Sequence, residues 1–98
     1  MGKYKIITFK YFERRYLKLL KKQPKITIRV VKVFKLLRTD PFQISLKTHK
    51  VISKKYGEKW VSYVSRDIRI IWDFDSNEIR VIMVMDIGGH SGKNKIYK

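Results

Sequence analysis

The sequence predicts an α+β fold: an N-terminal strand and two helices, followed by a small, mainly antiparallel sheet. Apolar residues recur at helical spacing between residues 11 and 37, whereas residues 60–87 contain apolar runs of strand length around a turn. The chain has 98 residues, which is enough for one compact core. We therefore expect residues 1–98 to form a single domain.

The N-terminal part of the chain predicts a strand and two helices. Residues 4–9 are rich in β-branched and aromatic side chains, which favour a strand. Residues 11–22 show an amphipathic pattern with a basic outer face, which predicts a helix. A second apolar stripe, over residues 24–39, begins with a proline, which suits a first helical turn, and ends before Pro41. Residues 25–30 also alternate like a strand, so a strand in this place is the alternative.

The rest of the chain predicts a sheet. Residues 42–57 are a basic connector that leaves room for one brief strand. A strand is expected over residues 60–65. Two longer apolar runs, residues 68–74 and 79–87, predict a hairpin around a turn at residues 75–78.

The register of this hairpin decides which side chains meet. If residues 76–77 form a two-residue turn, Arg69 pairs with Val84. Asp67 then pairs with Asp86, so that both carboxylates lie near Arg69 on the outer face. The other face, which we expect to be the core, carries Ile68, Ile70, Trp72, Phe74, Ile79, Val81, Met83 and Met85.

The acidic residues near the hairpin turn have a structural explanation. Asp73 opposite Arg80 predicts a cross-strand ion pair at the surface, which adds little to stability. Asp75 and Glu78 beside Asp73 could suggest a metal site, but exposed turns carry such residues for turn formation and solubility. The chain has no cysteine, so disulfides and thiolate metal sites are excluded. We expect neither a metal nor another cofactor.

The chain is strongly basic. It holds 24 Lys and Arg against 8 Asp and Glu, a net charge of +16, and the basic residues are spread along its length. Such a protein attracts phosphate polymers and binds them by counterion release. A basic protein without a nucleic-acid partner, or one that binds an acidic protein, is the alternative. No apolar run approaches the roughly 18 residues of a membrane span, and the N-terminus lacks the apolar core of a signal peptide, so we expect a cytoplasmic protein.

Three residues carry side chains suited to cleaving RNA. RNA supplies its own nucleophile, the 2′-hydroxyl, so cleavage without a metal needs a proton acceptor, a proton donor and a group that stabilises charge. His90 can act as general acid or base, since an ordinary histidine titrates near pH ~6.5. Arg69 can hold the phosphate with its planar guanidinium. Tyr97 can complete the proton transfer or stack on a base, and His49 is a second candidate for acid–base chemistry.

Each of these residues also has a structural interpretation. His90 follows a glycine pair and could be a hydrogen-bonded surface residue. Arg69 could pair with Asp86, and Tyr97 could pack on the sheet edge. The expected gathering of His90, Arg69 and Tyr97 at one end of the sheet favours the catalytic interpretation.

The order of elements and several short motifs resemble the RelE/ParE superfamily of bacterial toxins, in particular its RelE-like and YafQ-like mRNA interferases. The likeness extends from Ile6 to Tyr97. The motifs are Asp40-Pro41, His49-Lys50, Trp60-Val61-Ser62, the strand from Asp67 to Trp72, and Ile87 to Ser91 with Tyr97. This resemblance implies a RelE-like fold.

The resemblance also implies roles for single residues. It implies that Arg69 contacts the scissile phosphate, that His90 protonates the leaving group or stabilises charge, and that Tyr97 stacks on the mRNA or transfers a proton. YafQ-like members also use a connector histidine and an aspartate, which correspond to His49 and Asp67. The basic residues expected to hold the RNA are Lys50, Lys54, Arg66, Lys93 and Lys95.

The activity implied by the resemblance is that of a ribosome-dependent endoribonuclease. The family cuts mRNA in the ribosomal A site and is neutralised by a cognate antitoxin, so we expect a hetero-oligomer with an acidic antitoxin and no membrane partner. Ser62 and Tyr63 replace lysines of the RelE-like toxins, which leaves the general base open. The alternatives are a non-catalytic, ParE-like inhibitor of DNA gyrase and a basic RNA-binding protein that stacks bases on Tyr4, Tyr11 and Tyr63.

Overall fold

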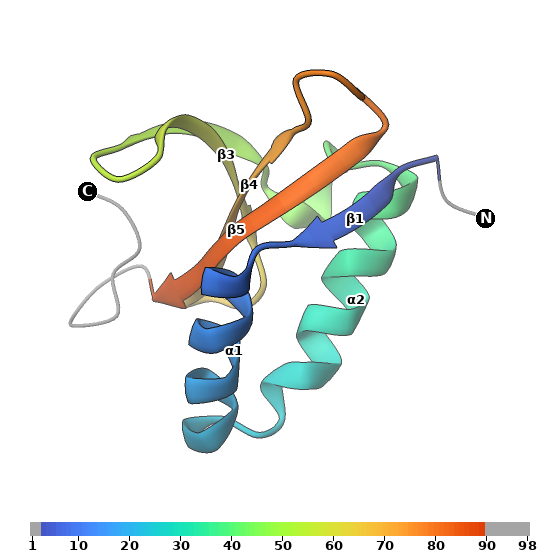
Figure 1. The fold of residues 1–98 in the computed structure, drawn as a ribbon. Helices are drawn as coiled ribbons and strands as arrows, with labels where there is room; N and C mark the ends of the chain where they lie inside the picture. The colour runs from blue at the N-terminus through green and yellow to red at the C-terminus, as the bar shows by residue number, and fades with distance from the viewer. Residues whose placement is uncertain (1–2, 90–98) are drawn as a thin grey trace.

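The structure, a computed structural model, describes residues 3–89 and shows a twisted sheet with two helices on one face (Figure 1). The elements in chain order are β1 (Lys5–Thr8), α1 (Lys10–Lys22), α2 (Ile26–Thr39), the 3-10 helix η1 (Ile44–Leu46), β2 (His49–Ser53), β3 (Gly57–Tyr63), β4 (Ile68–Phe74) and β5 (Val81–Gly89). This order confirms the predicted α+β fold, in which a strand and two helices precede the sheet. No helix among the described residues is long and apolar enough to cross a membrane.

Within residues 3–89, five strands form one sheet in the order β1-β5-β4-β3-β2. Strands β2 to β5 form an antiparallel meander, and β1 pairs parallel with β5. The pairing of β1 runs from Lys5 opposite Val81 to Thr8 opposite Val84, so it covers only the first part of β5. Residues 85–89 of β5 therefore have β4 on one side, while α1 packs against the strand (Figure 1).

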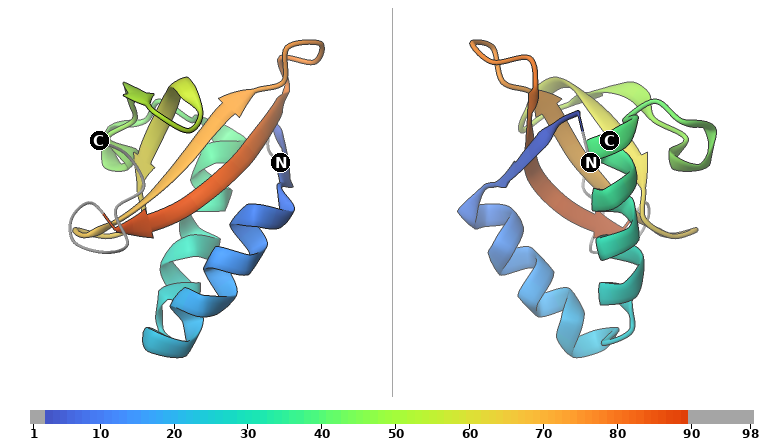
Figure 2. Two further views of the ribbon diagram at one scale, coloured as in Figure 1. Left: turned by 60° about the vertical axis from the view of Figure 1, so that its left-hand side comes forward. Right: turned by 90° about the vertical axis from the view of Figure 1, so that its right-hand side faces the viewer.

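Both helices lie on the same face of the sheet, as Figure 2 shows from two sides. The buried residues of α2 are Ile26, Val30, Val33 and Leu37, which form a stripe at helical spacing. This stripe confirms the second predicted helix and shows that the strand alternative for residues 25–30 is wrong. Burial of the stripe outweighs the strand preference of the β-branched residues in it.

The predicted connector contains the short helix η1 and the edge strand β2. η1 is followed by Lys47, whose φ of 50° turns the chain in the left-handed region before β2 begins. β2 and β3 are joined by a tight turn that ends at Gly57, with a φ of 78° that glycine adopts without strain. The brief strand expected in the connector is thus confirmed, and β3 begins three residues earlier than residues 60–65 suggested.

The register of the β4–β5 hairpin differs from the predicted one. Arg69 pairs with Gly88 rather than with Val84. The connection is one cause, because it spans residues 75–80 instead of forming a two-residue turn. A register shift after Ile71 is the other cause, since it places an additional residue on β5, as a β-bulge does.

The bulge and the long connection also change which residues of β5 face the helices. Ile82, Val84 and Ile87 lie in the helix-side core, each at most 1% exposed. Met83 and Met85 belong to a smaller apolar cluster on the other face, so their predicted place in the main core is wrong. The predicted core residues of β4 are confirmed, since Ile68, Ile70 and Trp72 lie in the helix-side core and Phe74 packs against it.

The predicted ion pair between Asp73 and Arg80 is also wrong. Asp73 stands opposite Met83 in the ladder, and its carboxylate accepts a hydrogen bond from Lys59 Nζ at 3.2 Å. The partner therefore comes from β3 rather than from β5. Both side chains are partly exposed, so this pair adds little to stability.

Candidate functional site

The sheet face away from the helices, which we call the open face, carries the predicted arginine. Arg69 lies on β4, with Tyr63 of β3 on one side and Gly88 of β5 on the other. Its Cζ atom is 3.4 Å from the centre of the Tyr63 ring, so the guanidinium stacks on the phenol. The ring of His49, on β2, lies edge-on with its centre 6.2 Å from that of Tyr63. The structure thus brings two predicted catalytic residues, Arg69 and His49, to either side of one tyrosine.

Arg69 is buried, and not all of its hydrogen-bond donors have a partner. Its side chain is 4% exposed, and Nη1 donates to the carbonyl oxygens of Arg66 at 2.8 Å and of Ser65 at 3.0 Å. Its Nε is buried without a hydrogen-bond partner. Among residues 3–89 no carboxylate lies at ion-pair distance from it, so the alternative that Arg69 pairs with Asp86 is wrong. A buried cation without a counter-charge is costly, and an anion on the open face would reduce that cost.

The turn between β3 and β4 is held by the same arginine. Because Arg69 binds the carbonyl of Arg66, it fixes the peptide that leads to Asp67. The hydroxyl of Ser65 accepts a hydrogen bond from the backbone N–H of Ile68 at 3.1 Å and closes the turn. The side chains of Arg66 and Asp67, predicted to bind RNA and to assist catalysis, are exposed at this turn.

Two predicted RNA-binding lysines of the connector lie in different places. Lys50 stands opposite Trp60, and its Nζ lies 4.2 Å from the centre of the Trp60 ring. Since side chains alternate along a strand, Lys50 and His49 point to opposite faces of the sheet. His49 stands opposite Val61 and shares the open face with it. Lys54 is exposed in the turn between β2 and β3.

A second polar group, the Asp86 cluster of Arg15, Tyr56 and Asp86, lies where α1, the β2–β3 turn and β5 meet. The Tyr56 hydroxyl donates to Asp86 Oδ2 at 3.2 Å, and Arg15 Nε is 3.5 Å from Asp86 Oδ1. Asp86 is 2% exposed; burial raises the pKa of its carboxyl, and Arg15 opposes that rise. Burial also raises the pKa of the Tyr56 phenol, and the Asp86 carboxylate adds to the rise. The cluster fastens the β2–β3 turn to α1 through one buried carboxyl group.

Tyr11 extends this cluster toward solvent. Lys55 Nζ lies 3.4 Å from the centre of the Tyr11 ring, and Arg15 Nη1 donates to the Tyr11 hydroxyl at 3.4 Å. Lys55 and then Arg15 lower the pKa of the Tyr11 phenol, because both favour the phenolate. The sequence indicated only a stacking role for Tyr11 and did not indicate Arg15, Lys55 or Tyr56. No local pattern reveals the group, since its members come from three distant segments.

Ser62 and Tyr63, at the positions where the resemblance implied lysines, have different surroundings. Ser62 is fully buried, accepts a hydrogen bond from Trp72 Nε1 at 2.8 Å, and lies 2.6 Å from Thr48 Oγ1. Thr48 in turn donates to the carbonyl of Pro41. Ser62 therefore links the connector to the sheet, whereas Tyr63 supports the guanidinium on the open face.

The predicted site residues His90, Lys93, Lys95 and Tyr97 lie outside the described residues. The described part of β5 ends at Gly89, opposite Ile68, one residue after the pair of Gly88 and Arg69. Within residues 3–89, no three His, Asp or Glu side chains come together to hold a metal ion.

Comparison with known proteins finds similarity in structure and not in sequence. No protein-family model matches the chain, and no curated protein is similar to it in sequence. The crystal structure of YafQ from E. coli strain BL21(DE3) matches with a TM-score of 0.67 and 19% identity, covering 88% of this chain and 92% of that one. The archaeal RelE–RelB complex from Pyrococcus horikoshii OT3 matches with a TM-score of 0.63 and 17% identity, covering 87% and 92%. The chain has the fold of the YafQ and RelE toxins.

The expected RelE-like fold is therefore confirmed over most of the chain. The chain also matches the crystal structure of the E. coli DinJ–YafQ toxin–antitoxin complex, with a TM-score of 0.67, 19% identity, and coverage of 90% of this chain and 93% of that one. In this RelE-like fold, Arg69 and Tyr63 lie on β4 and β3, two neighbouring strands of the sheet. The Asp86 cluster connects the β2–β3 turn to β5 through the hydrogen bond from Tyr56 to Asp86. At such low identity the likeness shows the fold alone.

Proposed function

We propose that the protein is the toxin of a toxin–antitoxin system and acts as an endoribonuclease on mRNA. The observation that carries this proposal is the state of Arg69: it is buried, stacked on Tyr63, and has an unpartnered Nε. A guanidinium in this state suits a phosphate group, which accepts two parallel hydrogen bonds from it. The net charge of +16 adds long-range attraction for RNA. The similar E. coli complex is a toxin–antitoxin complex, which supports the same function.

In the proposed reaction the RNA attacks itself. The 2′-oxygen bonds to the adjacent phosphorus and the bond from phosphorus to the 5′-oxygen breaks, which leaves a 2′,3′-cyclic phosphate and a 5′-hydroxyl. Arg69 stabilises the charge that develops on the phosphorane oxygens. His90 donates the proton to the leaving 5′-oxygen, and Tyr97 accepts the 2′-proton or stacks on a base. His49 and Asp67 assist from β2 and from the β3–β4 turn, and the reaction uses no metal or other cofactor.

The proposed substrate is a message in the ribosomal A site, in the cytoplasm. Arg66 and Lys54 are exposed in two turns of the sheet, where phosphates of a bound strand can reach them. Phosphate contacts of this kind position a nucleic acid without reading its sequence. Lys50, Lys93 and Lys95 are further basic residues that we propose to hold the RNA.

The proposed partner is an acidic antitoxin that forms a hetero-oligomer with the toxin. The similar structures include the DinJ–YafQ and RelE–RelB complexes, in which the toxin-like chain is bound by a second protein. An acidic partner complements the +16 charge of this chain, and such complementarity speeds association. Co-expression with the product of the adjacent gene should yield a complex and restore growth.

The test of the proposed activity is cleavage of a defined message during translation in vitro. His90→Ala should lower the cleavage rate by ~10²-fold or more, because it removes a proton donor. Lys32→Ala, at an exposed position of α2, is the matched control and should cleave as the wild type does. A single 2′-deoxy nucleotide at the cleaved linkage should protect the message. An RNA that is bound but stays intact would instead identify a binding protein, and inhibited supercoiling by gyrase would identify a ParE-like inhibitor.

A further inference from the structure

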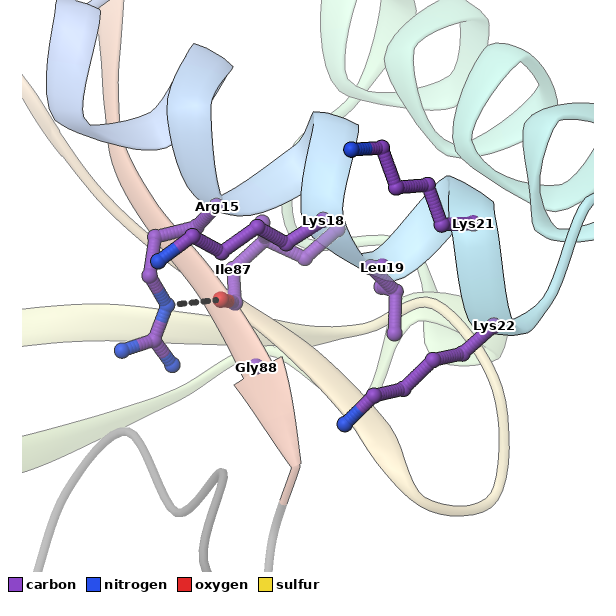
Figure 3. Close-up of a pocket in the computed structure, with 7 residues that line it drawn as sticks. All are labelled: Arg15, Lys18, Leu19, Lys21, Lys22, Ile87 and Gly88. Atoms are coloured by element: carbon purple, nitrogen blue, oxygen red, sulfur yellow. Dashed lines mark hydrogen bonds between the residues drawn. The ribbon is translucent and has the colours of Figure 1, made fainter.

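A pocket of about 350 Å³ lies between α1 and the end of β5, and we call it the α1 pocket. Figure 3 shows Lys18 extending alongside Arg15, and Lys22 extending toward the end of β5. These three residues follow one another at intervals of three and four, so they lie on one side of the helix over about 10 Å of its axis. The α1 pocket is therefore lined by a row of cations.

The lysines of the α1 pocket have no acidic partner among residues 3–89. Residues 14–39 contain ten Lys and Arg and no Asp or Glu. In the described part of the chain, no carboxylate lies at ion-pair distance from Lys18, Lys21 or Lys22, whereas Arg15 meets Asp86. The helix dipole favours Lys21 and Lys22 in the last turn of α1, but Lys18 lies a turn earlier. The lysines of the pocket are therefore able to bind an anion.

The α1 pocket adjoins the Arg69 site across a single strand. Gly88 lines the pocket and is also the residue of β5 that pairs with Arg69. Neighbouring strands are about 4.8 Å apart, and a glycine puts no side chain between them and a ligand. β1 pairs with β5 only as far as Val84, so it does not cover Gly88. A chain of phosphates at Arg69 can therefore continue over Gly88 into the pocket.

We propose that the α1 pocket binds a backbone phosphate of single-stranded RNA next to the linkage held at Arg69. The inference rests on the proposed function, because it takes RNA to lie on the open face. Lysine ammonium groups bind phosphate as point charges, without a fixed geometry. They therefore suit the phosphate of a flanking nucleotide, whatever its base. RNA is favoured over an acidic peptide because its phosphates recur at every nucleotide, so that one strand can place a phosphate at Arg69 and another beside Gly88, which lines the pocket.

The test measures binding of a single-stranded oligonucleotide in which every 2′-hydroxyl is replaced by hydrogen, so that it cannot be cleaved. The double variant Lys18→Ala, Lys22→Ala is compared with Lys32→Ala, Lys35→Ala, which removes the same charge from exposed positions of α2. In the pocket variant, the slope of log K against log salt should become shallower by ~0.7 for each phosphate that the protein no longer neutralises. The α2 variant should keep the wild-type slope. Alanine favours helix, so both variants should unfold at the wild-type temperature.

The outcomes separate this inference from the proposed function. If the slope of log K against log salt is the same for the two double variants, the proposal that the α1 pocket binds RNA is wrong, even if the wild type cleaves the message. A loss of the complex with the antitoxin in the pocket variant, with RNA binding unchanged, overturns it in favour of a peptide. A shallower slope in the pocket variant alone supports it, and it does so even if the wild type fails to cleave RNA.

Discussion

The guanidinium of Arg69 rests on the ring of Tyr63, with 3.4 Å between Cζ and the ring centre. This contact and the backbone carbonyls of the β3–β4 turn are what hold a cation that is 4% exposed. The resemblance to RelE-like toxins implied a lysine at this position of β3, where the chain has Tyr63. A lysine beside Arg69 would repel it, whereas the π face of a tyrosine attracts it.

Replacing the Tyr63 ring should therefore weaken both stability and activity. Tyr63→Leu removes the π face and should lower the free energy of unfolding by about 1–2 kcal/mol, while Tyr63→Phe keeps the face and should lose much less. Cleavage of a message should fall in the same order. Urea unfolding and a cleavage assay check both effects. A Phe variant as unstable as the Leu variant would show that the hydroxyl, and not the ring, matters.

The Asp86 carboxyl should give stability a pH dependence of known sign. Burial raises its pKa above the ordinary value of 3.8. A group with a raised folded-state pKa contributes stability below its unfolded-state pKa, and this contribution is lost as the pH rises through the folded-state value. Asp86→Asn cannot ionise, so its free energy of unfolding relative to that of the wild type should increase as the pH rises above about 4.

Urea unfolding at several pH values checks this trend. Glu58→Gln, which removes a carboxyl group from an exposed position of β3, is the matched control. If the difference in unfolding free energy between Asp86→Asn and the wild type does not change with pH, the carboxyl group is not buried as described.

The phenol of Tyr11 should titrate below its ordinary pKa of 10.0 because of Lys55. Lys55→Ala should raise this pKa toward the ordinary value, whereas Lys54→Ala, its exposed neighbour, should leave it where it is. Absorbance titration measures the phenol when each protein is compared with its own Tyr11→Phe variant. Equal titration curves for the Lys55 and Lys54 variants would contradict the contact between Lys55 and Tyr11.

The core of α2 should be sensitive to loss of volume. Leu37 is 0% exposed, so Leu37→Ala should lower the free energy of unfolding by about 2–5 kcal/mol. Leu17, on α1, is 61% exposed, so Leu17→Ala should change it by less than about 0.5 kcal/mol. Urea unfolding of the two variants measures the contrast. Similar losses would mean that α2 does not pack on the sheet by this face.

Much of the fold could be predicted from local patterns. The apolar stripes of both helices, the strand of residues 68–74 and the face on which Ile70 and Trp72 lie follow from helical and strand periodicity alone. The face of β5 could not be predicted, because a bulge beside Ile71 and a six-residue connection each shift the register. Nothing in the sequence of the strand marks either of them.

The candidate site could be predicted in part. Arg69 and His49 were expected on residue type and resemblance, and the fold brings them to either side of Tyr63. The Asp86 cluster could not be predicted, because its contacts depend on how the β2–β3 turn lies against α1. A buried carboxyl group finds its partners through tertiary packing, which short motifs do not encode.

The most direct measurement of the central claim is the rate at which Arg69→Lys cleaves a translated message, compared with the wild type at a temperature where both are folded by circular dichroism. Lysine keeps the charge but lacks the planar fork, so the rate should fall by ~10²-fold or more. Cleavage by Arg69→Lys at the wild-type rate would contradict the assignment of Arg69 to the scissile phosphate.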